Sequence, residues 1–164
     1  MFTSKRYAQA VVAFQRAQKP REAMICRAFL LRENARVVPD DQTKERAKAF
    51  TEAGEIFSTC ASESQPHQKK ERLAYYTNAA ECFAQGHRFK EAGDCFMLAG
   101  HYSKAACAYR EGGHFDEMVG VLEGHADQIE AKLLAQLKKV AQMNYFKVGK
   151  TAYHWRPTTE TVHH

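Results

Sequence analysis

Proline and glycine are scarce in this 164-residue sequence, which contains 4 prolines and 9 glycines. That scarcity excludes a collagen-like or low-complexity protein. Long apolar runs are also missing, so we expect no membrane-spanning segment and no membrane partner. The N-terminal Met-Phe-Thr-Ser-Lys-Arg-Tyr has no apolar stretch behind it, which argues against a secretory signal. The sequence therefore predicts an intracellular protein, either cytoplasmic or nuclear.

Cysteines are few, and their number is odd. The chain contains 5 of them, none in a C-x-x-C pair: Cys26, Cys60, Cys82, Cys95 and Cys107. This pattern argues against a disulfide framework, and it lacks the closely spaced ligand pairs of a structural zinc site. We expect all five to be small buried apolar residues, with a redox or metal role as the alternative.

The motifs of catalytic sites are missing as well. A nucleotide-binding phosphate loop reads Gly-x-x-x-x-Gly-Lys-Ser/Thr. Gly149-Lys150-Thr151 matches its end, but Asn144 stands where the first glycine is needed. No Gly-x-Ser-x-Gly nucleophile elbow occurs either. We therefore predict no enzyme activity, no catalytic residue, no cofactor, no metal site and no small-molecule substrate. An enzyme whose site has no known motif remains the alternative.

What the sequence does contain is a globular composition, with 45% apolar and 26% charged residues, and a repeated pattern. In each copy a large residue at position i is followed by small or medium apolar residues at i+3 and i+4 and a large residue at i+7. This spacing marks one face of an α-helix. The copies are Tyr7–Phe14, Phe50–Phe57, Tyr76–Phe83, Phe89–Phe96, Tyr102–Tyr109 and Phe115–Leu122.

The last four copies begin 13 residues apart, which indicates an internal repeat. Small residues at i+3 and i+4 let a neighbouring helix approach closely, while the rings fill the space around them. Short helices of this kind bury their apolar face only by stacking on each other. We therefore expect largely buried rings at Phe50, Phe57, Tyr76, Phe83, Phe89, Phe96, Tyr102 and Tyr109.

Four Gly-His pairs follow the ends of these segments: Gly86-His87, Gly100-His101, Gly113-His114 and Gly124-His125. Glycine in such a place supplies the left-handed conformation that ends a helix. The short links between segments predict antiparallel neighbours. His87 and His101 would then lie at opposite ends of a shared helix, so we interpret the histidines as helix-start residues rather than metal ligands.

The pattern predicts an all-α protein, an α-solenoid of stacked antiparallel helical hairpins. Residues 1–150 would form a single helical repeat domain, and residues 151–164 an irregular tail. The expected helices are Ser4–Ala17, Pro20–Ala35, Thr43–Cys60, His67–Ala84, Phe89–Leu98, Tyr102–Glu111, Phe115–Glu123 and Ala126–Met143. The last one has an apolar stripe, Ile129, Leu133, Leu137 and Val140. We interpret it as a capping helix, or alternatively as a docking surface for further repeats.

Basic residues are concentrated near the N-terminus. Residues 1–36 contain 8 Lys and Arg against 2 acidic residues, within a chain of net charge +5. Such a concentration is compatible with a phosphate-binding patch. The candidate basic contact residues are Arg6, Arg16, Lys19, Arg21, Arg27, Arg32 and Arg36.

Alternating helices with a large, small, small, large signature resemble tetratricopeptide-like repeats. The order of Ser-Lys-Arg-Tyr-Ala-Gln-Ala (4–10), Arg-Ala-Gln-Lys-Pro-Arg-Glu-Ala (16–23), Ala-Phe-Leu-Leu-Arg-Glu-Asn-Ala-Arg (28–36) and Ala-Ala-Glu-Cys-Phe (79–83) is more specific. It is similar to the helical region after the UvrD-like helicase core in large fungal tetratricopeptide and ankyrin repeat-containing proteins. The resemblance covers residues 4–150, and it implies no catalytic residue in this chain.

Two functions follow as hypotheses. The first is a non-catalytic scaffold for protein–protein interaction, part of or derived from a larger helicase-containing protein, because stacked hairpins create an extended binding surface. The second is an accessory module that contacts nucleic acid through the basic N-terminal helices. Salt separates them, because phosphate contacts weaken steeply as salt rises.

Overall fold

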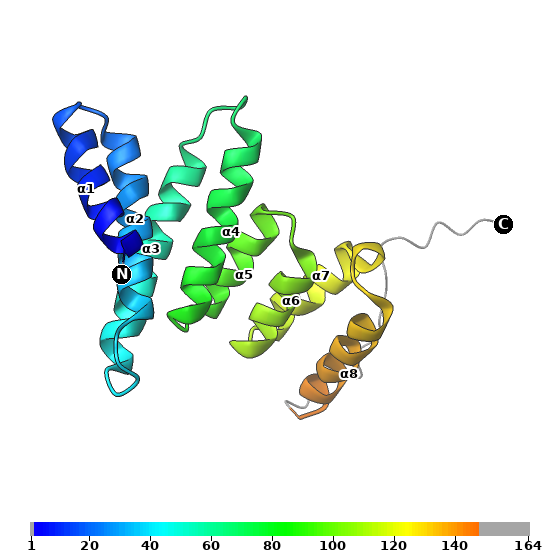
Figure 1. The fold of residues 1–164 in the computed structure, drawn as a ribbon. Helices are drawn as coiled ribbons and strands as arrows, with labels where there is room; N and C mark the ends of the chain where they lie inside the picture. Colours follow the sequence, from blue (N-terminus) through cyan, green and yellow to red (C-terminus); the bar gives the residue numbers. More distant parts are fainter. Residues whose placement is uncertain (1, 148–164) are drawn as a thin grey trace.

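The computed structural model describes residues 2–147, and within them it contains eight α-helices, one 3₁₀ turn and no strand (Figure 1). The predicted all-α class is confirmed for this part of the chain, while the predicted tail, residues 151–164, lies outside it. The helices are α1 Phe2–Arg16, α2 Pro20–Arg36, α3 Thr43–Ser62, α4 Lys69–Gln85, α5 Phe89–Leu98, α6 Tyr102–Glu111, α7 Phe115–Gly124 and α8 Ala131–Lys147.

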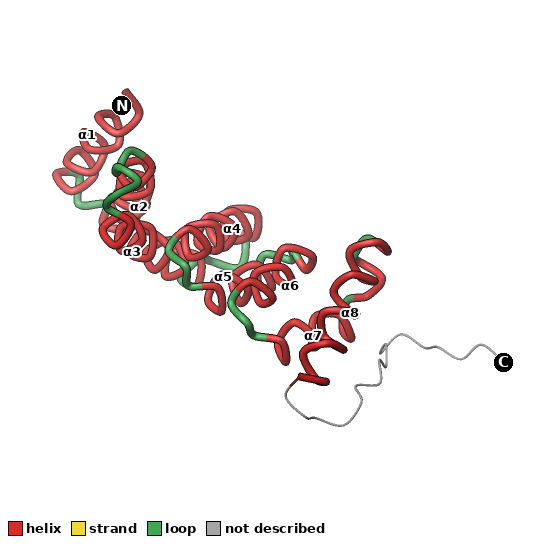
Figure 2. Tube along the Cα trace, turned by 90° about the horizontal axis from the view of Figure 1, so that it is seen from below, coloured by secondary structure: helices red, strands yellow, loops and turns green. Residues whose placement is uncertain are grey.

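The helices follow one another in a single row, and each packs mainly on the next helix in the chain (Figures 1 and 2). Successive helices run in opposite directions, as expected from short links. Three of these links, residues 86–88, 99–101 and 112–114, follow each other at intervals of 13 residues. The spacing found in the sequence is therefore the length of one short helix together with its link.

The three links end their helices with the same backbone hydrogen bond. The N–H of Arg88 donates to the carbonyl of Phe83 at 2.8 Å, and the corresponding bonds join His101 to Phe96 at 2.9 Å and His114 to Tyr109 at 2.8 Å. Such a bond, spanning six residues, satisfies a carbonyl that the helix itself leaves open. In these three helices, the large residue that ends the copy of the pattern therefore lies two residues before the last helical residue and accepts the closing bond.

The predicted left-handed glycines are confirmed at two links and wrong at the other two helix ends. Gly100 and Gly113 have φ angles of +80° and +75°, whereas after α4 the left-handed residue is His87, with φ +60°. A Cβ on Gly86 would lie 2.4 Å from Oγ1 of Thr51 in α3. Glycine at that position therefore serves the close approach of α4 to α3. Gly124 is the last residue of α7 and does not have a positive φ.

The small residues of the pattern form the contacts between helices. From α3 to α6 they are all buried: Ala53, Gly54, Ala79, Ala80, Ala92, Gly93, Ala105 and Ala106. A Cβ on Gly54 would lie 3.1 Å from the ring of Phe83, and one on Gly93 would lie 2.4 Å from the ring of Tyr109. In both cases the ring belongs to the next helix of the row. The last large residue of one helix thus packs over the small residue of the helix before it.

The predicted burial of the eight rings holds fully for five of them: Phe50, Phe57, Phe83, Phe96 and Tyr109. Tyr76, Phe89 and Tyr102 are only half-buried, so the expectation is wrong in degree for these three. Each of the three begins a copy of the pattern and lies in the first half of its helix. Phe50 also begins a copy and is buried, so position i alone does not set the exposure of a ring.

A second set of rings connects the four N-terminal helices. Tyr7 of α1 stacks on Phe29 of α2 with a centroid distance of 5.2 Å. Phe29 meets Phe57 of α3 edge-on at 4.9 Å, and Phe57 stacks on Tyr75 of α4 at 6.5 Å. Aromatic pairs at these distances contribute about 0.5–1.5 kcal/mol beyond their buried area. One ring from each helix therefore links α1 to α4; we call these four rings the aromatic ladder.

The last predicted helix, Ala126–Met143, has the wrong bounds. Residues Ala126–Gln128 form a 3₁₀ turn, the backbone at Ile129 is extended, and α8 begins at Ala131. The side chain of Ile129 is buried, so its anchoring in the core accompanies the break that separates the turn from α8. A continuous apolar stripe does not reveal such a break.

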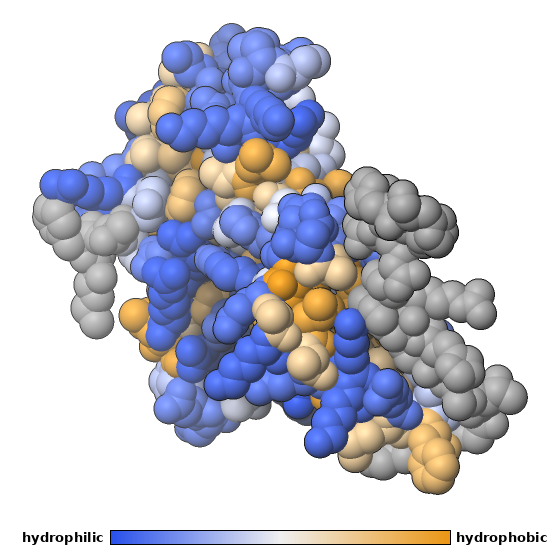
Figure 3. All heavy atoms as spheres, turned by 90° about the vertical axis from the view of Figure 1, so that its right-hand side faces the viewer, coloured by the Kyte–Doolittle hydropathy of each residue, from blue (hydrophilic) through white to orange (hydrophobic). Residues whose placement is uncertain are grey.

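The stripe on α8 faces the core. Leu137 is fully buried, and Leu133 and Val140 pack partly against the core residues. The stripe therefore covers the end of the row, as a capping helix does. Further along α8, Met143 is 54% and Phe146 is 87% exposed. Figure 3 views the molecule from the α8 side and shows apolar side chains at the surface among hydrophilic ones. The docking alternative for this helix stays a prediction.

Candidate functional site

The seven predicted basic residues do not form one surface. Arg6, Arg16 and Lys19 are exposed along α1 and the link that follows it. Arg21 donates to Oγ of Ser64 at 3.0 Å, and Arg27 pairs with Glu52 at 3.1 Å. Arg27 thus contacts α3, and Arg21 contacts the link that follows the C-terminal end of α3.

The structure places Arg32 and Arg36 together at a cavity of about 330 Å³ between α2, α3 and α4. A third arginine, Arg46 of α3, joins them from a part of the sequence that was not predicted as basic surface. We call this cavity the arginine cleft. Its lining residues are Arg32, Arg36, Arg46, Phe50, Glu81, Cys82 and Gln85.

Arg32 is held rigidly at the arginine cleft. Its guanidinium donates from Nη1 to Oδ1 of Asn78 at 3.1 Å, and Nη2 lies 3.2 Å from Oε1 of Glu33. Its Cζ also lies 4.9 Å from the centroid of the Phe29 ring. Because the side chain is only 17% exposed, these contacts are little screened by water. Arg32 therefore couples the aromatic ladder to the cleft.

The two other arginines are more accessible. Arg36 pairs with Glu33 at 2.8 Å, and its side chain is 54% exposed. Arg46 pairs with Asp40 at 3.0 Å and lies over the ring of Phe50 at 5.9 Å. The Asp40 side chain is 98% exposed, so this ion pair contributes little to stability.

Cys82 is the one sulfur in the lining of the arginine cleft, and it is almost fully buried. Burial raises the pKa of this thiol to about 11, against the weaker opposing effect of Arg32. The thiol is therefore protonated at neutral pH, and a protonated thiol is a poor nucleophile. In this position Cys82 acts as an apolar wall.

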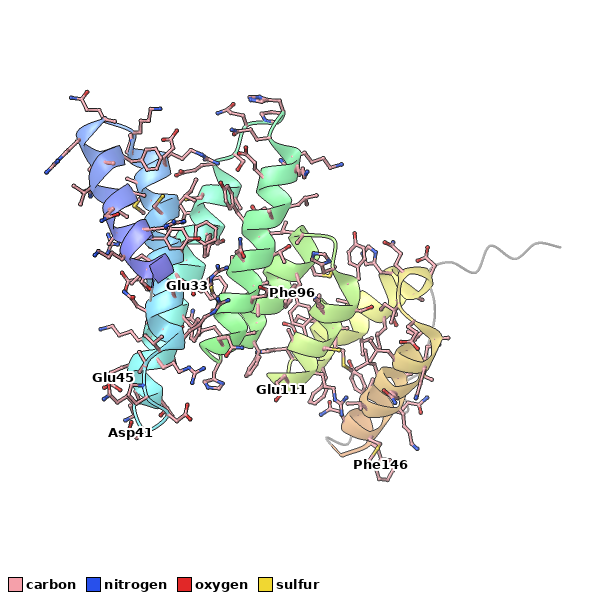
Figure 4. All side chains as sticks on the ribbon, viewed as in Figure 1. Glu33, Asp41, Glu45, Phe96, Glu111 and Phe146 are labelled. Carbon is pink, nitrogen blue, oxygen red and sulfur yellow. The ribbon has the colours of Figure 1, made fainter. Side chains whose placement is uncertain are left out.

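A second cavity, of about 530 Å³, lies next to the first and shares the lining residues Arg46 and Gln85 with it. Its other lining residues include Asp40, His87, Phe89 and Glu111. We call the two cavities together the edge groove, because they follow the ends of helices α2 to α6 along one side of the row. Figure 4 shows Asp41 in the turn before α3, Glu45 in the first turn of α3 and Glu111 at the end of α6, on this same side.

The charge along the edge groove is uneven. The arginine cleft has three guanidinium groups and one carboxylate, that of Glu81. The second cavity has the carboxylates of Asp40 and Glu111, with Arg46 at the boundary between the two. The predicted basic residues did not include Arg46, because they were chosen from the segment of the chain with the largest excess of basic residues, and Arg46 lies outside that segment. A usable signal was present, since Arg46 and Phe50 are four residues apart on one face of a helix.

The histidines of the Gly-His pairs have separate structural contacts. His125 stacks on Tyr102 with a centroid distance of 3.6 Å, His101 lies 3.2 Å from Oγ1 of Thr77, and His87 contacts Phe89. Within residues 2–147, no three His, Cys, Asp or Glu side chains lie close enough to hold a metal ion.

The prediction that all five cysteines are buried is wrong for two of them. Cys60, Cys82 and Cys95 are buried, but Cys26 is half-buried and Cys107 is exposed. Cys107 directly follows the small pair Ala105 and Ala106, and the next position of a helix already points away from the contact. The pKa of Cys95 is raised to about 11 and that of Cys107 is also raised, in both cases mainly by desolvation.

Neither the helices nor known proteins add a further indication of function. No helix within the described residues combines the length and apolarity needed to span a membrane. Comparison of the chain with protein families, curated proteins and solved structures finds no match.

Proposed function

We propose that this chain is a non-catalytic protein-binding scaffold, an α-solenoid of tetratricopeptide-like hairpins, and that its edge groove holds an extended segment of a partner protein. One observation carries the proposal. The two cavities share Arg46 and Gln85, so they are neighbours, and together their lining extends from α2 to α6. An extended ligand fits such a shape better than a compact one does, and repeat proteins bind along extended surfaces of this kind.

The lining of the edge groove supports binding rather than catalysis. Its one thiol, Cys82, is neutral at pH 7 because burial raises its pKa to about 11. Its arginines are held by Glu33, Asn78 and Asp40. Guanidinium groups held in place in this way can position a polar ligand. Among the lining residues, no nucleophile is paired with a base. The sequence resemblance adds the proposal that the scaffold belongs to, or derives from, a larger helicase-containing protein.

Site-specific photocrosslinking tests the scaffold. A benzoylphenylalanine at Gln85 places the probe in both cavities, and the same residue at the exposed Cys107 lines neither of them. Both variants are exposed to lysate of the source cells at low and high salt. We expect a protein adduct from position 85 that persists at high salt and is missing from position 107.

Two results would contradict the scaffold. Equal adducts at both positions would show that the edge groove does not direct binding. A nucleic-acid adduct that disappears at high salt would instead favour the accessory nucleic-acid module, because counterion release makes phosphate contacts strongly salt-dependent.

A further inference from the structure

The lining of the arginine cleft indicates the chemistry of its ligand, an inference that rests on the proposed scaffold. Its three arginines are already paired with Glu33 or Asp40, so a ligand carboxylate would share or replace these partners. We infer that the arginine cleft binds a carboxylate of an acidic partner segment, with an apolar side chain next to that carboxylate. The geometry points to this pair of groups because three guanidinium groups surround a floor made by Phe50 and Cys82. Both floor residues are buried and uncharged.

A guanidinium group offers five N–H donors in a planar fork, which matches the two oxygens of a carboxylate. In the arginine cleft, Asp40 accepts from Nη1 of Arg46, and Glu33 accepts from Nη1 of Arg36. The remaining donors of both groups are left for other partners, and both residues line the cavity of about 330 Å³. Arg32 supplies a fixed point, since Asn78, Glu33 and Phe29 hold it in place.

Asp40 shows how a ligand would enter. Its side chain is 98% exposed while it pairs with Arg46, so water already competes for that pair and little energy holds it. A ligand carboxylate lying inside the cleft makes the same contact where solvent is partly excluded, and charge-assisted hydrogen bonds are stronger there. Asp40 is therefore the partner that a ligand carboxylate would displace from Arg46.

Glu81 is the opposing charge in the lining. It is exposed, and it lies one residue before Cys82 on α4. Its carboxylate repels an acidic ligand, although weakly through water. Two substitutions that each remove one charge consequently have opposite effects: Arg46→Gln removes an attractive charge and Glu81→Gln removes a repulsive one.

The test uses defined peptides and the side-chain Nε–Hε NMR signals of the arginines in the full chain. The probe is N-acetylated and C-amidated Glu-Leu-Glu, compared with Gln-Leu-Gln, Lys-Leu-Lys and phosphoserine-Leu-phosphoserine. We expect saturable shifts for Arg32, Arg36 and Arg46 with the glutamate peptide at millimolar concentration, and weaker or no shifts with the amide and lysine peptides.

The variants sharpen the result. Arg46→Gln is expected to weaken binding about tenfold, the size of one lost charge-assisted hydrogen bond. Glu81→Gln is expected to tighten binding roughly threefold, because the removed repulsion acts through solvent. Arg27→Gln is the matched control, since Arg27 is also an exposed, paired arginine but lines neither cavity. Backbone amide spectra of each variant verify that the fold is unchanged.

Three outcomes overturn the inference: no shift of the three arginines with the glutamate peptide, equal shifts with Gln-Leu-Gln, or binding of the phosphoserine peptide alone. A failed titration together with a protein adduct at position 85 removes the carboxylate and keeps the scaffold. A successful titration with no protein adduct removes the scaffold and keeps an anion site.

Discussion

Helices α1 to α4 contain between 15 and 20 residues each, whereas α5 to α7 contain 10 residues each. The long helices are joined by the aromatic ladder, which places one ring from each helix in contact with the next. The short helices are joined by small residues, with a ring from the following helix packed over them, as Tyr109 packs over Gly93. The long helices α3 and α4 combine both kinds of contact, because Phe83 also packs over Gly54.

This difference between long and short helices shows how the length of a helix limits the kinds of contact that it makes with its neighbours. A helix of 10 residues makes about three turns, so almost every inward position is needed for close packing. A longer helix has further turns that carry polar contacts between helices, such as Arg27 with Glu52 and Arg32 with Asn78. The edge groove begins among the long helices and ends at Phe89 and Glu111 of the short ones. The edge groove therefore crosses the boundary between the two kinds of packing.

The largest expected effect comes from breaking the aromatic ladder. Phe57 is fully buried and contacts both Phe29 and Tyr75. We expect Phe57→Ala to lower the free energy of unfolding by about 3–5 kcal/mol, as removal of a buried ring usually does. Because each helix contacts mainly its neighbours, hydrogen exchange should accelerate in α2 to α4 and change less in α6 and α7.

Hydrogen exchange in helices far from Phe57 shows whether the long helices and the short helices unfold separately. If Phe57→Ala accelerates exchange equally in α3 and α7, the chain unfolds as one cooperative unit. The ladder would then be an ordinary part of a common core. Denaturant unfolding monitored by circular dichroism gives the total loss, and exchange monitored by mass spectrometry gives its location.

The next effect concerns the small residues. Ala80 and Ala106 are completely buried, so a leucine at either position has no room without displacing the neighbouring helix. We expect Ala80→Leu or Ala106→Leu to cost about 1–3 kcal/mol, the usual range for overpacking. Ala106→Leu should disturb α5 to α7 and spare the aromatic ladder, the reverse of Phe57→Ala.

Lys104→Ala is the matched control on α6. The Lys104 ammonium lies 5.9 Å from the Phe96 ring centroid and is exposed, so its loss should cost about 0.5–1 kcal/mol at most. Urea midpoints of the three variants give the ranking. A leucine variant with the wild-type midpoint would show that the alanine is not a closely packed contact, and the 13-residue alignment would be wrong at that position.

Much of the fold was predictable from the sequence, and most accurately in the short helices. The bounds of Phe89–Leu98 and Tyr102–Glu111 agree with the structure, because each helix is a single copy of the pattern with a tight link on either side. The end of α8 and the break at Ile129 were missed. There the apolar spacing continues through a change of backbone conformation that only tertiary packing imposes.

The arginine cleft was less accessible to prediction. Its residues come from α2, α3 and α4, and Arg32, Arg46 and Glu81 are far apart in the chain. Local spacing does not encode which of several surface arginines meet across helices. The predicted basic surface therefore contained Arg32 and Arg36 but not Arg46. The resemblance to helicase-associated helical regions stays a prediction, as does the scaffold function.

The smallest expected effect tests a hydrogen bond between two short helices. The Tyr109 hydroxyl on α6 donates to Oδ1 of Asp94 on α5 at 2.5 Å. Asp94 is 47% exposed, so water replaces the lost donor in Tyr109→Phe. We expect this variant to lose about 1 kcal/mol at neutral pH. A matched pair on the last helices, Tyr145 and Asp116, is also joined at 2.5 Å.

The pH dependence of that variant separates the hydrogen bond from packing. Burial, together with the hydrogen bond to Asp94, raises the pKa of Tyr109 in the folded protein. The folded state therefore keeps this proton when the unfolded state loses it, near pH of about 10. Stability contributed by the bond is complete below that pH and is lost as the pH rises through the folded pKa.

Buried thiols such as Cys82 add a similar loss of stability at alkaline pH in both wild type and Tyr109→Phe. Wild type should thus lose stability faster than Tyr109→Phe above a pH of about 10, and the gap between their urea midpoints should close. Parallel curves would show that the phenol proton does not stabilise the contact between α5 and α6.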